Sequence, residues 1–135
     1  MKENIILLIV EDLAHEIFLA RRAVDRANCF CIVVENLEDA ENFLEMTKEV
    51  IFGAITGLHF PKSAKEKHGP DKLNGLDFTK LCVEQGIRVA VCSDSSSHFE
   101  SSIKRLSEHP ACRGNKIPLC KKDWDGAITE LLKIK

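Results

Sequence analysis

The sequence lacks the paired cysteines on which small zinc-binding domains depend. It has six cysteines, but none forms a CxxC pair, and only Cys29 and Cys31 stand close together. A zinc site needs ligands paired at short loop spacing. Most of the six lie in apolar runs such as CFCIVV, VAVC and IPLC. We therefore expect small, reduced core residues, with a redox or metal role as the alternative.

Signals for export, membrane insertion and nucleic-acid binding are also missing. The apolar run IILLIV, residues 5–10, is too short to cross a bilayer, and the acidic pair ED follows it without a small-residue cleavage site. The net charge of -2 gives no general attraction to nucleic acids or membranes. These absences predict a cytoplasmic protein without membrane association.

The sequence does contain a regular alternation of strand and helix patterns. Short apolar runs predict strands at 4–10, 30–35, 50–56, 87–93 and 116–120. Amphipathic segments between and after them predict helices at 11–28, 36–48, 75–86, 97–109 and 123–135. This order predicts a single α/β domain over residues 1–135, with a doubly wound, five-stranded parallel sheet covered by helices on both faces.

Helix faces and helix starts can be assigned from residue spacing. One face of the first helix is marked by apolar residues three or four apart, namely Leu13, Ile17, Ala20, Val24 and Ala27. Asn36 is a candidate N-cap for the second helix. Ser97 and Glu100 have the spacing of a capping box at the start of the fourth.

Candidate functional residues follow the predicted strands, because open parallel sheets bind ligands outside the carboxyl ends of their strands. The residues at these positions are Glu11, Asp12, Glu35, Gly57 to Pro61, Ser93, Asp94 and Lys121 to Asp123. The set combines adjacent carboxylates, a small hydroxyl and a lysine at one predicted edge.

A segment without apolar periodicity, residues 62–74, interrupts the alternation. It contains four lysines, two acids and the pair Gly69-Pro70. We predict an extended, mobile loop, either a solvated insertion or a basic flap beside the functional edge. No aromatic residues are interleaved with the lysines, which argues against nucleic-acid binding.

Four motifs in order, LLIVEDL, AITGLHFP…NGLDF, VAVCS and PLCKK, make the whole chain resemble the receiver domain of bacterial response regulators. The resemblance implies a flavodoxin-like fold with a phosphorylation site. Glu11 and Asp12 match the acidic pair that binds magnesium in the family. Ser93 matches the hydroxyl that binds a phosphoryl oxygen, and Lys121 matches the lysine that pairs with the phosphoryl group.

The chain departs from the family at the phospho-accepting aspartate. In the family this aspartate stands four residues before a proline in the motif of the third strand. Here that proline is Pro61 and the matching residue is Gly57, which has no side chain. Neither Thr56 nor Leu58 offers a carboxylate instead. We predict that phosphotransfer is lost and that a vestigial Mg²⁺ site at Glu11 and Asp12 is weak or absent. Lys121 is expected to turn toward those acids.

Further departures concern the fifth strand and the long loop. Pro118 stands where the family often has an aromatic switch residue, and Lys122 stands where it usually has proline. The loop between Pro61 and Gly75 is longer than in the family. A switch that works by side-chain rotation is therefore not expected.

These residues predict a phosphorylation-independent protein-interaction module in signal transduction, with no enzymatic activity, no cofactor and no output domain in the chain. Its partner would be another protein, and a homodimer stays open. The resemblance implies a contact surface around the fourth helix, fifth strand and fifth helix. That surface would carry Lys104, Arg105, Lys122, Trp124 and Asp125. Packing of Trp124 on the adjacent loop is the alternative to a role in binding.

The alternative function is a small enzyme or ligand-binding protein on a flavodoxin-like fold. The acidic segment VEDLAHE repels phosphate, and no nucleophile–base pair is visible in the sequence. A hyper-reactive Cys92 beside Ser93 would favour this alternative. We interpret His59 as an exposed loop residue, with metal ligation as the other possibility.

Overall fold

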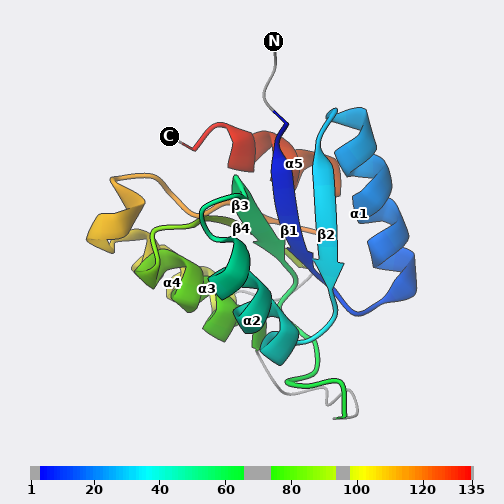
Figure 1. Cartoon of the computed structure of the whole chain (residues 1–135). Coiled ribbons are helices and arrows are strands. Elements are labelled where there is room, and N and C mark those ends of the chain that lie inside the picture. Colours follow the sequence, from blue (N-terminus) through cyan, green and yellow to red (C-terminus); the bar gives the residue numbers. More distant parts are fainter. Residues whose placement is uncertain (1–3, 66–73, 94–97, 135) are drawn as a thin grey trace.

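A computed structural model describes residues 4–65, 74–93 and 98–134. They form one five-stranded sheet with helices on both faces, as the alternation of patterns predicts (Figure 1). The strands are β1 (Ile6–Val10), β2 (Phe30–Val34), β3 (Gly53–Thr56), β4 (Arg88–Cys92) and β5 (Leu119–Cys120). All pairings are parallel, in the order β2-β1-β3-β4-β5. The predicted doubly wound fold is confirmed.

The helices follow the strands in alternation and cover the two faces of the sheet. They are α1 (Ala14–Arg26), α2 (Leu37–Thr47), α3 (Asn74–Glu84), α4 (His98–Ser107) and α5 (Trp124–Leu132). A short 3-10 helix, η1 (Pro110–Cys112), follows α4. Helices α1 and α5 lie on one face, while α2, α3 and α4 lie on the other (Figure 1). No helix within the described ranges is long and apolar enough to span a bilayer.

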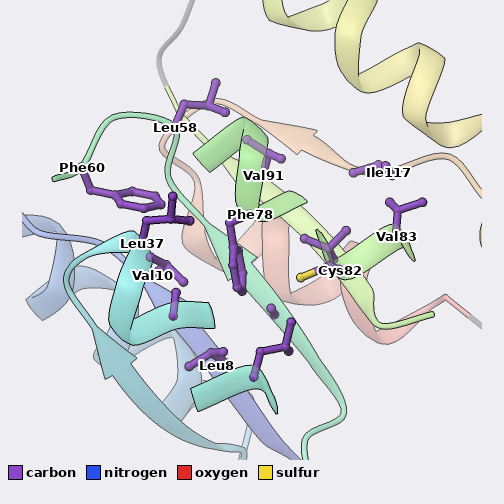
Figure 2. Close-up of a cluster of buried hydrophobic side chains, with 14 of the residues drawn as sticks. Leu8, Val10, Leu37, Leu58, Phe60, Phe78, Cys82, Val83, Val91 and Ile117 are labelled. Carbon is purple, nitrogen blue, oxygen red and sulfur yellow. The ribbon is translucent and has the colours of Figure 1, made fainter. Parts of the chain in front are cut away.

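The core has two halves because alternate residues of a strand point to opposite faces of the sheet. Leu8 and Val10 of β1 join the cluster under α2 and α3, whereas Leu7 and Ile9 join the cluster under α1 and α5. Figure 2 shows the first cluster, with Phe78 of α3 near its middle. This double burial explains why the strands are continuously apolar.

Local signals were mostly confirmed, with three differences. Asn36 caps α2 by accepting the Asp39 N–H at 2.8 Å. Leu13 does not belong to the buried face of α1, because it precedes the helix as N-cap and is 50% exposed. Strand β3 begins at Gly53, and β5 contains only Leu119 and Cys120.

Some predictions lie outside the described residues. They are the capping role of Ser97, the position of Asp94 and most of the predicted loop at 62–74, of which 66–73 are not described. The part of that loop before residue 66 is anchored to α2. The Leu37 and Glu38 N–H groups donate to the carbonyl oxygens of Pro61 and Lys62 at 2.9 and 2.8 Å.

Gly75 allows α3 to pack directly on the loop that follows β3. An ideal β-carbon there would overlap the carbonyl oxygen of Gly57 and lie 2.5 Å from Leu58 Cα. The Gly75 N–H donates to the Leu58 carbonyl at 3.0 Å, and the Asn74 side chain donates to the Phe60 carbonyl at 2.7 Å. The contact thus fixes the backbone on which Gly57 sits.

We predict that Gly75→Ala lowers the free energy of unfolding by about 3 kcal/mol, because the added methyl group meets backbone that cannot move aside. Gly86→Ala is the control. Gly86 has open space around it, so its φ of +71° is the only source of strain, and we expect a loss of about 1 kcal/mol. Urea denaturation measures both. Equal losses would contradict the close-approach argument.

Candidate functional site

Residues that follow four neighbouring strands meet at the carboxyl edge of the sheet. Glu11 follows β1, Gly57 follows β3, Ser93 follows β4, and Lys122 lies two residues after Cys120, the end of β5. Backbone hydrogen bonds continue the sheet past the strand ends. The Gly57 N–H donates to the Val10 carbonyl oxygen, and the Ser93 N–H donates to the Cys120 carbonyl oxygen, both at 2.9 Å. The predicted edge therefore brings these residues together.

The Glu11 carboxylate is the centre of the site and is buried, with only 2% exposure. Its Oε2 accepts the backbone N–H groups of Asp12 at 2.9 Å and Leu13 at 3.2 Å. Its Oε1 accepts a hydrogen bond from Lys122 Nζ at 3.2 Å. Burial raises the pKa of Glu11 above its ordinary value of 4.5, while Lys122 and the two backbone donors oppose that rise.

The lysine that reaches the acidic site is Lys122, so the assignment of Lys121 to this role is wrong in geometry. Lys121 is exposed, whereas the Lys122 side chain is only 26% exposed and pairs with Glu11. Both lysines lie in the bend that follows β5, which ends at Cys120. The backbone at Lys122 also turns into the left-handed region, with φ +40°.

Gly57 leaves the space that Glu11 and Lys122 use. An ideal β-carbon at Gly57 would lie 3.2 Å from Glu11 Oε1 and 3.7 Å from the Val10 carbonyl oxygen. Strands β1 and β5 are separated by β3 and β4, yet their terminal side chains meet. The neighbouring hydroxyl of Thr56 is fully buried and donates to the Gly57 carbonyl at 2.7 Å, which removes it as a replacement group.

A residue beside the site that the sequence argument missed is Glu16, in the first turn of α1. Its Oε1 accepts the Trp124 indole N–H at 2.9 Å and lies 3.9 Å from Lys122 Nζ. Glu11, Glu16, Lys122 and Trp124 thus form one network that joins β1, α1 and α5. Nothing in the sequence connects Glu16 to Trp124, which is 108 residues away.

The structure revises the predicted contact surface. Trp124 is 3% exposed and packs in the core beneath α1 and α5, so it cannot be a surface anchor. Lys122 points into the acidic site instead. Asp125 is exposed, but it holds Arg26 of α1 in a two-bond ion pair, at 3.0 and 2.7 Å. Lys104 and Arg105 are exposed on α4 as predicted.

Asp12 is half-buried beside an open, acidic hollow of about 480 Å³. Glu35 and Asp39 also line this hollow, together with the start of the long loop at Pro61 and Ser63. Among the described residues, no cluster of three or more histidine, cysteine, aspartate or glutamate side chains has the geometry of a metal centre. Weak metal binding at Glu11 and Asp12 stays a prediction.

Two further residues named as candidates from the sequence, Ser93 and His59, are buried or half-buried. The Ser93 side chain is buried, with 5% exposure, directly behind the edge. His59 is half-buried between the buried residues Leu58 and Phe60, so its interpretation as an exposed loop residue is wrong. The residue before it, Leu58, contacts the start of α3, because its carbonyl oxygen accepts the Gly75 N–H.

The thiols do not favour nucleophilic chemistry. All six cysteines are free, and burial raises the pKa of each thiol, that of Cys92 to about 12. A reactive cysteine needs the opposite shift, because the thiolate is the nucleophile. This observation weakens the hypothesis of an enzyme with a hyper-reactive Cys92.

Comparison with known proteins places the fold among receiver domains. No family model matches the chain, and no curated protein matches it. A response regulator receiver protein from Pseudomonas putida is 18% identical, with a TM-score of 0.69 and all of both chains covered. A receiver domain protein from Clostridium thermocellum is 12% identical, with a TM-score of 0.69, and the match covers 96% of this chain and 94% of that one.

A third similar structure is the RcsB response regulator of Salmonella typhimurium, which is 20% identical with a TM-score of 0.63. The match covers 96% of this chain but 59% of that protein. At these identities the likeness establishes the fold. The chain therefore has the receiver fold, and its chemistry must be argued from its own residues.

We predict that Lys122→Met destabilises the protein by about 1–3 kcal/mol near pH 7, because it leaves a buried carboxylate without its cation. The Glu11 pKa is already raised, so the folded state binds the proton more tightly than the unfolded state. Stability therefore falls as pH rises from the ordinary pKa of Glu11 to its higher pKa in the folded protein. Removing Lys122 raises the folded-state pKa further and so widens this pH range.

Urea denaturation near pH 7 and near pH 4 measures this effect. The loss should shrink toward pH 4, because Glu11 is increasingly protonated in both states as pH falls below its ordinary pKa of 4.5. Lys121→Met is the matched control and should change stability by less than about 0.5 kcal/mol. A larger loss for Lys121→Met than for Lys122→Met would contradict the placement of the two side chains.

Proposed function

We propose that the protein is a receiver-like protein-interaction module of signal transduction that works without phosphorylation of its own site. The observation that carries the proposal is Gly57 at the edge position between Glu11 and Ser93. An aspartyl phosphate forms when a carboxylate oxygen attacks phosphorus. No described residue directly before or after Gly57 supplies that oxygen, since Thr56 and Leu58 flank it.

The ion pair of Glu11 and Lys122 supports a site with one fixed arrangement. In a phosphorylatable site a lysine must be available to the incoming phosphoryl group. Here Lys122 Nζ is held by Glu11 at 3.2 Å and lies 3.9 Å from Glu16. The buried carboxylate of Glu11 and the half-buried carboxylate of Glu16 already place negative charge beside Lys122. The charge of the lysine is therefore balanced without a phosphoryl group.

The region linking the site to the fifth strand also supports a fixed state. Pro118 stands at the position of the family's switch residue, and its carbonyl oxygen accepts the Val91 N–H at 2.8 Å. Proline has no side-chain rotation comparable to that of an aromatic residue. A signal that depends on such a rotation is therefore not part of the proposal.

The proposed contact surface is the exposed side of α4. Lys104 and Arg105 are exposed in its last turn and have no ion pair with a described carboxylate. Two adjacent cations favour a partner with an acidic surface. A second copy of the chain is a further candidate partner, and sedimentation analysis would decide between a monomer and a dimer.

The direct test is incubation of the protein with acetyl phosphate and Mg²⁺, followed by intact-mass measurement. We expect no increase in mass, because the acceptor carboxylate is missing. A control receiver domain with an intact aspartate should gain one phosphoryl group under the same conditions. A gain of one phosphoryl group on this chain would overturn the proposal.

We predict that Gly57→Asp restores phosphorylation by acetyl phosphate, and that the restored activity depends on Lys122. The Gly57 φ is not in the left-handed region, and the added β-carbon needs a shift of only a few tenths of an ångström by Glu11 Oε1. The new carboxylate would join Glu11 and Asp12, which favours binding of a divalent cation.

Two double variants sharpen this test. Gly57→Asp with Lys122→Met should lose most of the restored phosphorylation, while Gly57→Asp with Lys121→Met should keep it. The opposite pattern would show that Lys121 takes over when a carboxylate is present. Phosphorylation of neither double variant would show that both lysines contribute.

A further inference from the structure

A second hollow lies at the opposite edge of the sheet, where the strands begin. Its volume is about 370 Å³. It is bounded by the end of α3, the start of β4, the turn after α4 and the last described residue. The lining residues are Val83, Gly86, Ile87, Arg88, Val89, Ala111, Cys112, Arg113, Asn115, Lys116, Ile117 and Ile134. The volume falls in the range of small-molecule sites.

The lining combines apolar walls with cations and no acid. Val83, Ile87, Val89, Ile117 and Ile134 supply aliphatic surface, and Figure 2 shows Val83 and Ile117 on one side of the buried cluster. Arg88, Arg113 and Lys116 supply three positive charges. None of the lining residues is acidic, although the chain as a whole carries a net charge of -2.

Arg88 is held in place without a counter-charge. Its Nε donates to the Ile134 carbonyl at 2.9 Å and its Nη1 to the Phe52 carbonyl at 3.2 Å, and the guanidinium lies 4.3 Å from the centre of the Phe52 ring. These acceptors are neutral. In the part of the chain that the structure describes, no carboxylate forms an ion pair with Arg88. The printed contacts of Arg88 therefore bring no negative charge to the hollow.

The turn that carries Arg113 is fixed before any ligand arrives. Arg113 has φ +52°, a left-handed conformation that costs a non-glycine residue about 1–2 kcal/mol. The turn is held by hydrogen bonds from the Asn115 side chain to the Cys112 carbonyl at 2.9 Å and from the Ile117 N–H to Ser107 Oγ at 2.9 Å. These bonds fix the backbone from which the exposed Arg113 side chain extends.

From these observations we propose that the hollow binds a small organic acid, with an aliphatic body against the isoleucine and valine walls and one carboxylate facing Arg113 and Lys116. A nucleotide fits less well, because no aromatic side chain lines the hollow to stack on a base. An uncharged apolar ligand would bring no negative charge to the three cations.

The proposal is independent of the proposed function. Arg88, which lines the hollow, is the first residue of β4, whereas Ser93 of the candidate phosphorylation site follows the last residue of β4. The two sites therefore lie at opposite ends of this strand. Loss of phosphotransfer therefore neither supports nor contradicts ligand binding. The two proposals can fail separately.

The experiment is a titration of the full chain with octanoate, followed by amide chemical shifts in two-dimensional NMR. We expect saturable shifts at Gly86, Ile87 and Ile117, with little change at Glu11 or Gly57. Octanol and octyltrimethylammonium are the matched probes without a negative charge. Each should bind at least about ten-fold more weakly, the size of effect expected for a charge-assisted hydrogen bond.

Two variants test the cations without disturbing the fold. Arg113→Gly relieves the left-handed backbone and should leave the melting temperature no lower, while Lys116→Ala removes an exposed side chain. The double variant should bind octanoate at least about ten-fold more weakly. Lys104→Ala with Arg105→Ala, which removes two cations on α4 outside the lining, should bind as the unchanged chain does.

The proposal is overturned if octanoate gives no saturable shifts at the hollow. It is also overturned if octanol binds as tightly as octanoate, or if the Arg113→Gly, Lys116→Ala variant keeps full affinity. Equal weakening by the α4 control variant would assign the effect to general charge rather than to this hollow.

Discussion

The buried carboxylate of Glu11 is the constraint on which the functional edge depends. A carboxylate taken out of water must be compensated by donors and cations, or it becomes protonated. Here two backbone N–H groups come from the turn into α1, and an ammonium group comes from the segment after β5. Because these donors belong to segments distant in sequence, the compensation of one charge ties the first and last thirds of the chain together.

Two glycines provide the clearance that this arrangement requires. Gly57 leaves room beside Glu11 Oε1, and Gly75 leaves room for the carbonyl oxygen of Gly57. Helix α3 can then press on the loop after β3, which in turn holds the edge where Glu11 and Lys122 meet. The absence of a side chain at Gly57 therefore has a structural consequence, since the Glu11 oxygen that pairs with Lys122 lies beside it. At the other end of β4, the carbonyl oxygens of Ile134 and Phe52 accept hydrogen bonds from Arg88.

Much of the architecture could be predicted because it rests on local periodicity. The apolar runs of β1 and β4 and the N-cap Asn36 are signals carried by neighbouring residues, and the structure confirms them. The errors concern residues whose placement depends on distant partners. Trp124 packs in the apolar core, where Glu16 of α1 accepts its indole N–H. Lys122 rather than Lys121 forms the ion pair with Glu11, which is 111 residues away. Neither contact can be predicted from the spacing of residues within a short segment.

The sequence by itself determined the order of strands and helices, the edge at which polar residues gather and the lack of a side chain at Gly57, because each follows from residue type and short-range pattern. The tertiary structure decided which of two adjacent lysines meets Glu11, that Trp124 is core rather than surface, and that three cations line one hollow at the start of β4. These outcomes depend on side chains brought together by the packing of helices on a sheet. Such contacts are set by the whole fold and not by any one segment.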